Sequence, residues 1–187
     1  MGLIRTHYLD ASAIVMLFVE EPGSDKLRAY IGPHATRHTT SLCLAESLGV
    51  LKAKYKHHHI THERYLACCE ELMAFLREGS LVVEDVQLST RAIFDQAEDL
   101  CRKYAMDFSD ACQLLTLRTG LLSKLEGESS PTLVTADQKL AQAAKREGLK
   151  AWDCVHDPLL TRQSTRMSSR QVFVWPRSRR SFLRWAA

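Results

Sequence analysis

The stretch THYLDASAIVMLF, residues 6–18, predicts a strand that passes directly into a helix. The strand-like run ends at Asp10, and the small and apolar residues typical of a buried helix follow at once. A carboxylate at this junction has two interpretations. It caps the helix by accepting hydrogen bonds from free backbone N–H groups, or it belongs to a functional site. The rest of the chain has to decide between them.

Strands and helices alternate along the rest of the chain. Periodicity and turn residues predict strands at residues 5–9, 37–40, 80–86, 132–135 and 149–154. They predict helices at residues 11–20, 24–31, 41–56, 61–78, 89–104, 108–119 and 137–147, with Ser24 as a cap and Gly79 as a terminator. Such alternation is typical of a parallel sheet covered on both faces. We therefore expect a three-layer α/β/α fold around a central parallel sheet of about five strands.

Length and composition predict one globular domain with a tail. The chain has 187 residues, of which 45% are hydrophobic, enough to bury a sizeable core. No stretch approaches the roughly 20 apolar residues that cross a bilayer, and the N-terminus lacks the pattern of a signal peptide. The six cysteines show no CxxC pair or zinc spacing, so we expect reduced, mostly packed thiols. A cytoplasmic protein without membrane contact is the expectation.

Basic residues gather at the C-terminal end. The whole chain has a net charge of +3, and residues 162–187 hold seven arginines and no acid, so residues 1–161 carry a net charge of −4. We expect a folded domain over residues 1–158 and an Arg-rich tail over residues 159–187. The tail is either a disordered, solvated extension or a basic arm for phosphate backbones. The basic, histidine-rich stretch KAKYKHHHITH, residues 52–62, is interpreted as a solvated helix end, with contact to RNA or a protein partner as the alternative.

Several acids lie where the predicted elements meet. Asp10 and Asp137 each follow a strand and open a helix, and Asp110 lies in the first turn of another helix, after Asp107. Each of them alone has an ordinary explanation. Asp10, Asp107 and Asp137 could be N-caps, and the helix dipole favours an acid such as Asp110 in a first turn.

Glu46 is harder to explain as a surface residue. Leu42, Gly49, Val50 and Ala53 are spaced so that Glu46 lies on the apolar stripe of its predicted helix. An ionised carboxylate rarely faces a core unless it is paired or binds a metal. We therefore expect a role in a site, with a boundary residue that reaches solvent as the alternative.

The topology brings these four acids to one edge of the sheet. In open parallel α/β sheets, ligands bind beyond the carboxyl ends of the strands. Two carboxylates 4 Å apart repel by about 4 kcal/mol at an effective dielectric near 20, so a cluster requires protonation or a cation. Hard divalent ions such as Mg²⁺ or Mn²⁺ suit oxygen ligands, and they support hydrolysis of phosphodiesters by an activated water.

Taken in order, four motifs resemble those of the PIN domain family, specifically the small VapC-type toxin ribonucleases of toxin–antitoxin pairs. The motifs are YLDASAIV around Asp10, TSLCLAESLGVL around Glu46, MDFSDACQLL around Asp110 and LVTADQKLAQAA around Asp137. The resemblance extends over residues 4–155. It implies a Mg²⁺- or Mn²⁺-dependent endoribonuclease that forms a homodimer and is inhibited by a cognate antitoxin. The Arg-rich tail is longer than the compact family pattern.

The resemblance also implies roles for single residues. Asp10 and Asp110 would be the principal metal ligands, and Glu46 and Asp137 would complete the acidic site. The hydroxyls of Ser12 and Thr135 would order these carboxylates or a bound water, although ordinary turn and cap chemistry explains them equally well. Two further acids, Asp107 and Asp153, are expected in cap and surface roles.

Two other classes of function remain as alternatives. One is a PIN-like module that has lost catalysis and only binds RNA or a protein partner. The other is an Asp-based receiver or phosphotransfer domain, which needs an acidic pair at the end of the first strand and a late lysine. Here Asp10 stands alone, and Lys139 falls inside a predicted helix, so the receiver is disfavoured.

Overall fold

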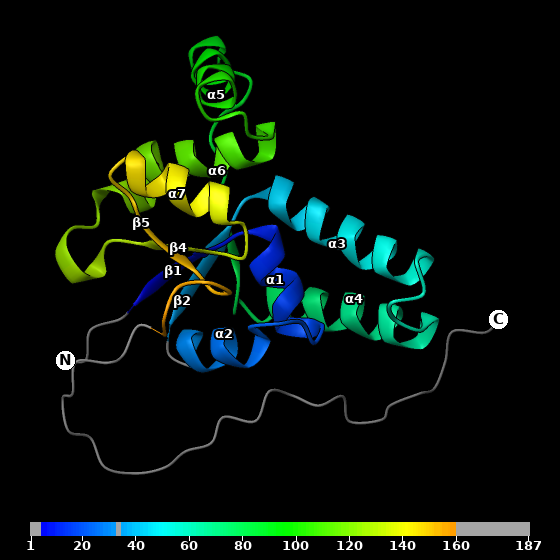
Figure 1. Cartoon of the computed structure of the whole chain (residues 1–187). Helices are drawn as coiled ribbons and strands as arrows, with labels where there is room; N and C mark the ends of the chain where they lie inside the picture. Colours follow the sequence, from blue (N-terminus) through cyan, green and yellow to red (C-terminus); the bar gives the residue numbers. More distant parts are fainter. Residues whose placement is uncertain (1–4, 33–34, 160–187) are drawn as a thin grey trace, which may run out of the picture.

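The computed structural model describes residues 5–32 and 35–159 of the chain. Its strands form one parallel sheet with the order β3-β2-β1-β4-β5 (Figure 1). They are β1 (Thr6–Leu9), β2 (Thr36–Thr39), β3 (Val82–Val83), β4 (Thr132–Thr135) and β5 (Lys150–Asp153). The predicted α/β fold with a central parallel sheet is confirmed.

Helices cover both faces of the sheet (Figure 1). One face packs against α1 (Ala11–Phe18), α2 (Ser24–Ile31), α3 (Ser41–Lys56) and α4 (His62–Arg77). The other packs against α5 (Arg91–Tyr104), α6 (Phe108–Thr119) and α7 (Gln138–Arg146). Two short 3₁₀ turns, η1 (Leu121–Lys124) and η2 (Gly127–Ser129), connect α6 to β4.

The alternation of side chains along the strands divides the core into two hydrophobic clusters. Leu9 of β1 and Val134 of β4 face the cluster under α1–α4, whereas Tyr8 and Leu133 face the cluster under α5–α7. All four side chains are fully buried. Successive residues of a strand point to opposite faces, so β1 and β4 hold the two outer layers together.

Two of the predictions about element boundaries need correction. The strand predicted at residues 80–86 contains only Val82 and Val83, which lie exposed on the edge of the sheet. Ser24 is the first residue of α2 rather than its cap; its hydroxyl accepts from the Glu21 N–H and donates to the Val19 carbonyl. The cap is Gly23, whose φ of 95° favours glycine and whose added Cβ would lie 3.0 Å from a backbone oxygen.

The cysteines match the prediction of packed, reduced thiols. All six are free within the described residues, and Cys43, Cys68, Cys112 and Cys154 are buried. Burial raises the pKa of the Cys43 thiol to about 12. A thiol that stays protonated is a poor nucleophile and a poor metal ligand.

Among the described residues, no helix has the length and hydropathy required to cross a membrane. The Arg-rich tail predicted for residues 159–187 lies, from residue 160 onward, outside the described residues.

Candidate active site

The four acids singled out in the sequence line one cleft of about 210 Å³. The cleft lies beyond the carboxyl ends of β1 and β4, where these strands lead into α1 and α7. Its walls also include residues of α3 and α6. The carboxylates that line it belong to Asp10, Glu21, Glu46, Asp107, Asp110 and Asp137.

Asp10 is the best-ordered of these acids. Its Oδ1 accepts hydrogen bonds from the Ala11 N–H at 2.6 Å and from Nε2 of Gln113 at 3.0 Å. Its Oδ2 accepts from the Ser12 N–H at 3.3 Å, and from two hydroxyls. With only 5% of its surface exposed, the side chain is fixed in one orientation. Asp10 is therefore both the cap of α1 and a wall of the cleft, so the two interpretations of the opening motif are compatible.

Ser12 and Thr135 supply the two hydroxyls that hold Asp10. Oγ of Ser12 lies 2.5 Å from Oδ2, and Oγ1 of Thr135 lies 2.8 Å from the same oxygen. The Ser12 hydroxyl also accepts from the Ala136 N–H, and the Thr135 hydroxyl accepts from the Asp137 N–H, both at 2.9 Å. The hydroxyls thus tie the end of β1 to the end of β4.

Gln113 is a site residue that the sequence analysis missed. It lies on α6 three residues after Asp110, so both side chains share a face of the helix. The side chain is fully buried, and its Nε2 donates to Asp10 while its Oε1 has no hydrogen-bond partner in the described part of the chain. An amide at i+3 from a candidate ligand, among leucines, was the available sequence signal.

Among the acids of the cleft, Asp110 has the pKa that is shifted furthest from its ordinary value. Its pKa is raised to about 7, first by burial and then by the charges of Asp10, Asp137 and Glu46. Its position in the first turn of α6 should favour the charged form. Burial and repulsion from the neighbouring acids outweigh the effect of the helix dipole. The charged form of Asp110 therefore lacks a compensating positive charge.

Glu46 lines the cleft, but not as the sequence predicted. The prediction of a core-facing apolar stripe is wrong, because Glu46, Gly49 and Ala53 are exposed. The buried row of α3 runs one position later, through Cys43, Ser47 and Leu51. Glu46 therefore stands at the rim of the cleft, where partial burial and the charge of Asp10 raise its pKa.

Asp137 and Asp107 take different roles at two helix starts. Asp137 is exposed and caps α7, because its Oδ1 accepts from the N–H groups of Lys139 and Leu140 at 2.7 and 3.1 Å. Asp107 occupies the cap position of α6 but makes no cap hydrogen bond, and its side chain lines the cleft. The prediction of a capping role for Asp107 is therefore wrong.

Asp153 lies outside the cleft. It is buried, with 2% of its surface exposed, so the predicted surface role is wrong. Its carboxylate accepts from the N–H groups of Val155 and His156 at 2.9 and 3.0 Å, and Oδ2 contacts the imidazole of His156. These contacts fix the turn that follows β5.

One basic side chain, Lys54 of α3, also lines the cleft. Its ammonium group is paired with the carboxylate of Glu21, and both side chains are largely shielded from solvent. The sequence analysis assigned neither residue to the site. Lys54 stands eight residues after Glu46, two turns further along the same face of the helix.

The donors of the cleft fit a hard divalent cation by their chemistry. They are carboxylate oxygens, which Mg²⁺ and Mn²⁺ prefer, and the pKa of Asp110 is raised first by burial and then by repulsion from the neighbouring acids, which a cation would offset. They do not form a closed ligand set: among the described residues, no three acidic, histidine or cysteine side chains stand close enough together to hold a metal ion. Binding would therefore draw the more exposed carboxylates, Glu46 and Asp137, towards the fixed Asp10.

Comparison with known proteins supports the fold. No protein-family model matches the chain, and no curated protein matches it. Among solved structures, the crystal structure of PAE2754 from Pyrobaculum aerophilum superposes with a TM-score of 0.51. The match covers 80% of this chain and 92% of that chain, at 20% sequence identity. A likeness at this identity shows a shared fold and carries no functional assignment.

Proposed function

We propose that the protein is a Mg²⁺- or Mn²⁺-dependent endoribonuclease that hydrolyses RNA phosphodiesters. The observation that carries the proposal is the gathering of Asp10, Glu46, Asp110 and Asp137 in one cleft beyond the carboxyl ends of β1 and β4. Such an edge is where parallel α/β folds bind their ligands. Mutually repelling acids at this position are costly without a cation, and their charges add to burial in raising the pKa of Asp110.

The residues of the cleft would have two different roles, cation binding and the positioning of Asp10. Asp10 and Asp110 would hold the cation, with Glu46 and Asp137 completing the ligand set. When bound, the divalent ion supplies an activated water and neutralises charge on the phosphate. Ser12, Thr135 and Gln113 keep the Asp10 carboxylate in one orientation at the wall of the cleft.

The resemblance of the four motifs to VapC-type PIN domains extends the proposal to the role of the protein in the cell. The protein would be the toxin of a toxin–antitoxin pair, acting in the cytoplasm as a homodimer and silenced by a cognate antitoxin protein. The lack of a closed ligand set in the described residues favours a second candidate, a PIN-like module that binds RNA or a protein partner without cleaving.

Cleavage by the purified, antitoxin-free full chain separates these two candidates. Single-stranded RNA is expected to be cut with Mg²⁺ or Mn²⁺ and to stay intact with EDTA. Asp110→Asn should lose more activity than the about 10- to 100-fold typical of outer-shell changes around a metal. Asp99→Asn is the matched control, because Asp99 is an exposed acid of α5 outside the cleft.

Two results would reject the nuclease. One is intact RNA at every Mg²⁺ and Mn²⁺ concentration tested, and the other is normal cleavage by Asp110→Asn. Expression of the wild type and Asp110→Asn in cells, with sequencing of new RNA 5′ ends, would then identify the RNA that the active protein cuts.

A further inference from the structure

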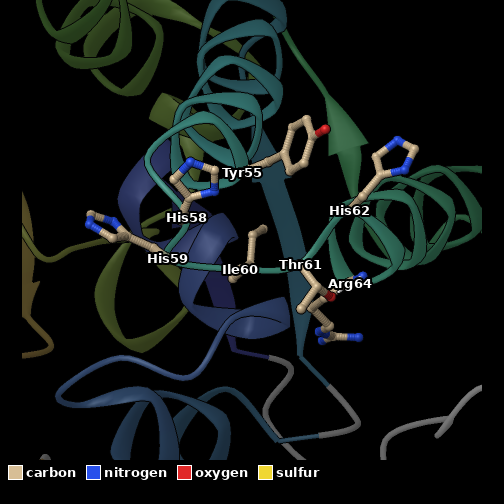
Figure 2. Close-up of a pocket in the computed structure, with 7 residues that line it drawn as sticks. All are labelled: Tyr55, His58, His59, Ile60, Thr61, His62 and Arg64. Carbon is tan, nitrogen blue, oxygen red and sulfur yellow. Dashed lines mark hydrogen bonds between the residues drawn. The ribbon is translucent and has the colours of Figure 1, made fainter.

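A second hollow, of about 470 Å³, lies at the turn between α3 and α4. Figure 2 shows its lining side chains around the turn, with His58 and His59 on one side of Ile60 and Tyr55 and His62 on the other. Thr61 and Arg64, at the start of α4, complete the lining. This hollow, called the turn pocket below, shares no lining residue with the acidic cleft.

Aromatic rings form one wall of the turn pocket. The ring of Tyr55 lies 5.0 Å from that of His62, and it stacks on Tyr65 at 5.5 Å with an interplanar angle of 13°. Tyr65, which does not line the hollow, thus supports the ring of Tyr55. A supported ring at a solvent-filled hollow is a platform on which a flat ligand can stack at low entropic cost.

Three imidazoles of the turn pocket are without hydrogen-bond partners among the described residues. In the described part of the chain, the side chains of His58, His59 and His62 make no hydrogen bond and no ion pair. The Thr61 hydroxyl, in contrast, accepts from the Arg64 N–H at 3.2 Å. All three are exposed. Arg64 is different, because its guanidinium is already held by Glu71 and by the Phe18 carbonyl. The imidazoles therefore provide the hydrogen-bonding edge, and Arg64 shapes the floor.

Two lysines lie near this hollow in the sequence. Lys52 and Lys56 of α3 are exposed, and neither forms an ion pair within residues 5–32 and 35–159. Residues 52–64 contain four basic residues and one acid, Glu63. The surroundings of the turn pocket thus suit a polyanion, in contrast with the acidic cleft.

Both sites contact α3. Glu46, Val50 and Lys54, each four residues after the one before, line the acidic cleft, and Tyr55, in the last turn of the same helix, lines the turn pocket. From Glu46 to Tyr55 the helix rises by about 14 Å. The two sites are therefore separated by about two and a half turns of α3.

We propose that the turn pocket binds a base of single-stranded RNA, outside the acidic cleft in which the backbone would be cut. The base stacks on Tyr55, the free imidazoles meet its edge, and Lys52 and Lys56 attract the backbone. This inference rests on the proposed function, since it takes RNA as the substrate. It assigns to the histidine-rich stretch the RNA contact that the sequence left as an alternative.

Binding, measured without cleavage, tests the turn pocket. The probe is a fluorescein-labelled, mixed-sequence, 12-nucleotide single-stranded RNA, and anisotropy is recorded with the full chain in EDTA. Tyr55→Leu removes the stacking ring but keeps apolar bulk, and Tyr55→Phe is its control. His58→Gly removes an imidazole from a residue with φ of 59°, which glycine adopts without strain.

Tyr55→Leu is expected to raise the Kd about tenfold, and Tyr55→Phe should stay within about twofold of wild type. His58→Gly should weaken binding by a smaller factor. Lys52→Ala/Lys56→Ala should reduce the salt dependence of binding, whereas Lys124→Ala, in an exposed 3₁₀ turn, should not. The melting temperature of each variant shows that the protein is folded.

The outcomes distinguish this inference from the proposed function. An unchanged Kd for both Tyr55→Leu and His58→Gly, in folded proteins, overturns the turn pocket even if RNA is cleaved. A Kd that depends on Tyr55 in a protein that never cuts RNA supports the turn pocket and rejects the nuclease.

Discussion

At Asp110, burial and neighbouring charges act in the same direction on one carboxyl group. Between the unfolded pKa of 3.8 and about 7, the folded protein holds a proton that the unfolded chain has released. The free energy of unfolding therefore falls as the pH rises through this range, and the loss is complete above pH 7.

Asp110→Asn should consequently stabilise the metal-free protein. The gain should be absent near pH 3.5 and reach at most about 4 kcal/mol at pH 8, less for solvent screening of this partly exposed group. Urea denaturation in EDTA at both pH values measures it. A variant that is less stable than wild type at pH 8 would contradict the repulsion inferred here.

Asp10→Asn should have the opposite effect on stability. Five donors converge on the two Asp10 oxygens, and an amide would turn its own NH₂ towards some of them. We expect a loss of about 1–3 kcal/mol, because a buried donor is left unpaired. Gln113→Leu removes one of these donors and should cost less.

Comparing urea denaturation of Asp10→Asn, Gln113→Leu and wild type checks this order. Equal stability of Asp10→Asn and wild type would show that the hydrogen bonds do not constrain Asp10. If Asp10→Asn is the least stable of the three proteins, its loss of cleavage would reflect both reduced folding and lost chemistry. Asp110→Asn is then the more informative active-site variant.

At the scale of elements, the central strand β1 contains a buried histidine. His7 is 1% exposed, and both of its ring nitrogens lack hydrogen-bond partners among the described residues. Burial, with the charges of Arg37 and Arg5, lowers its pKa to about 4. Below pH 6.5 the imidazole of His7 is protonated in the unfolded chain, but in the folded strand it stays neutral down to about pH 4. The free energy of unfolding therefore falls as the pH decreases from 6.5 to about 4.

This single residue should contribute about 3 kcal/mol to acid destabilisation. His7→Phe keeps an aromatic ring beside Tyr30, whose ring centroid is 4.9 Å from that of His7, and should flatten the pH profile of stability between 6.5 and 4. Denaturation at several pH values measures the slope. An equally steep loss in His7→Phe would assign the acid sensitivity to other groups.

Elements with strong local signals could be predicted from the sequence. The helices at 41–56 and 108–119 and the strand at 132–135 have the predicted bounds; Thr40 caps the start of the first helix, and Gly120 follows the end of the second. The strand at 80–86 was overestimated, because its apolar run has a neighbour only at Val82 and Val83. For Glu46 the helical spacing was predicted correctly, but the buried face of α3 was not. Packing against α1 and α4 selects that face, and the spacing of residues within one helix does not encode this packing.

The same limit applies to the site. Strand–helix junctions placed Asp10 and Asp137 at one edge, because topology alone brings such junctions together. Gln113 and the Lys54–Glu21 pair could not be found in this way, since their positions depend on how α3 and α6 pack around that edge.

At the scale of the whole molecule, the Arg-rich end can be separated from the domain. A chain that stops at residue 159 keeps the Trp152 Nε1–Pro158 carbonyl hydrogen bond at 3.0 Å, and it loses seven arginines. We expect metal-dependent cleavage to persist and the salt dependence of RNA binding to fall. Anisotropy at several salt concentrations, with full-length protein as the control, measures the second effect. If the truncated chain is folded but no longer cleaves RNA, that result would indicate that the tail is part of the active site.

The two-cluster core has a mechanical consequence. Glu46 stands on α3, in the layer of the first cluster, whereas Asp110 and Asp137 belong to α6 and α7 in the layer of the second (Figure 1). A cation bound among them would bridge the two outer layers across the end of the sheet. Amide hydrogen exchange should therefore slow in α3 and in α6 together when Mn²⁺ is added, and in neither for Asp110→Asn. The bound cation would then add a second link between layers that β1 and β4 already hold together.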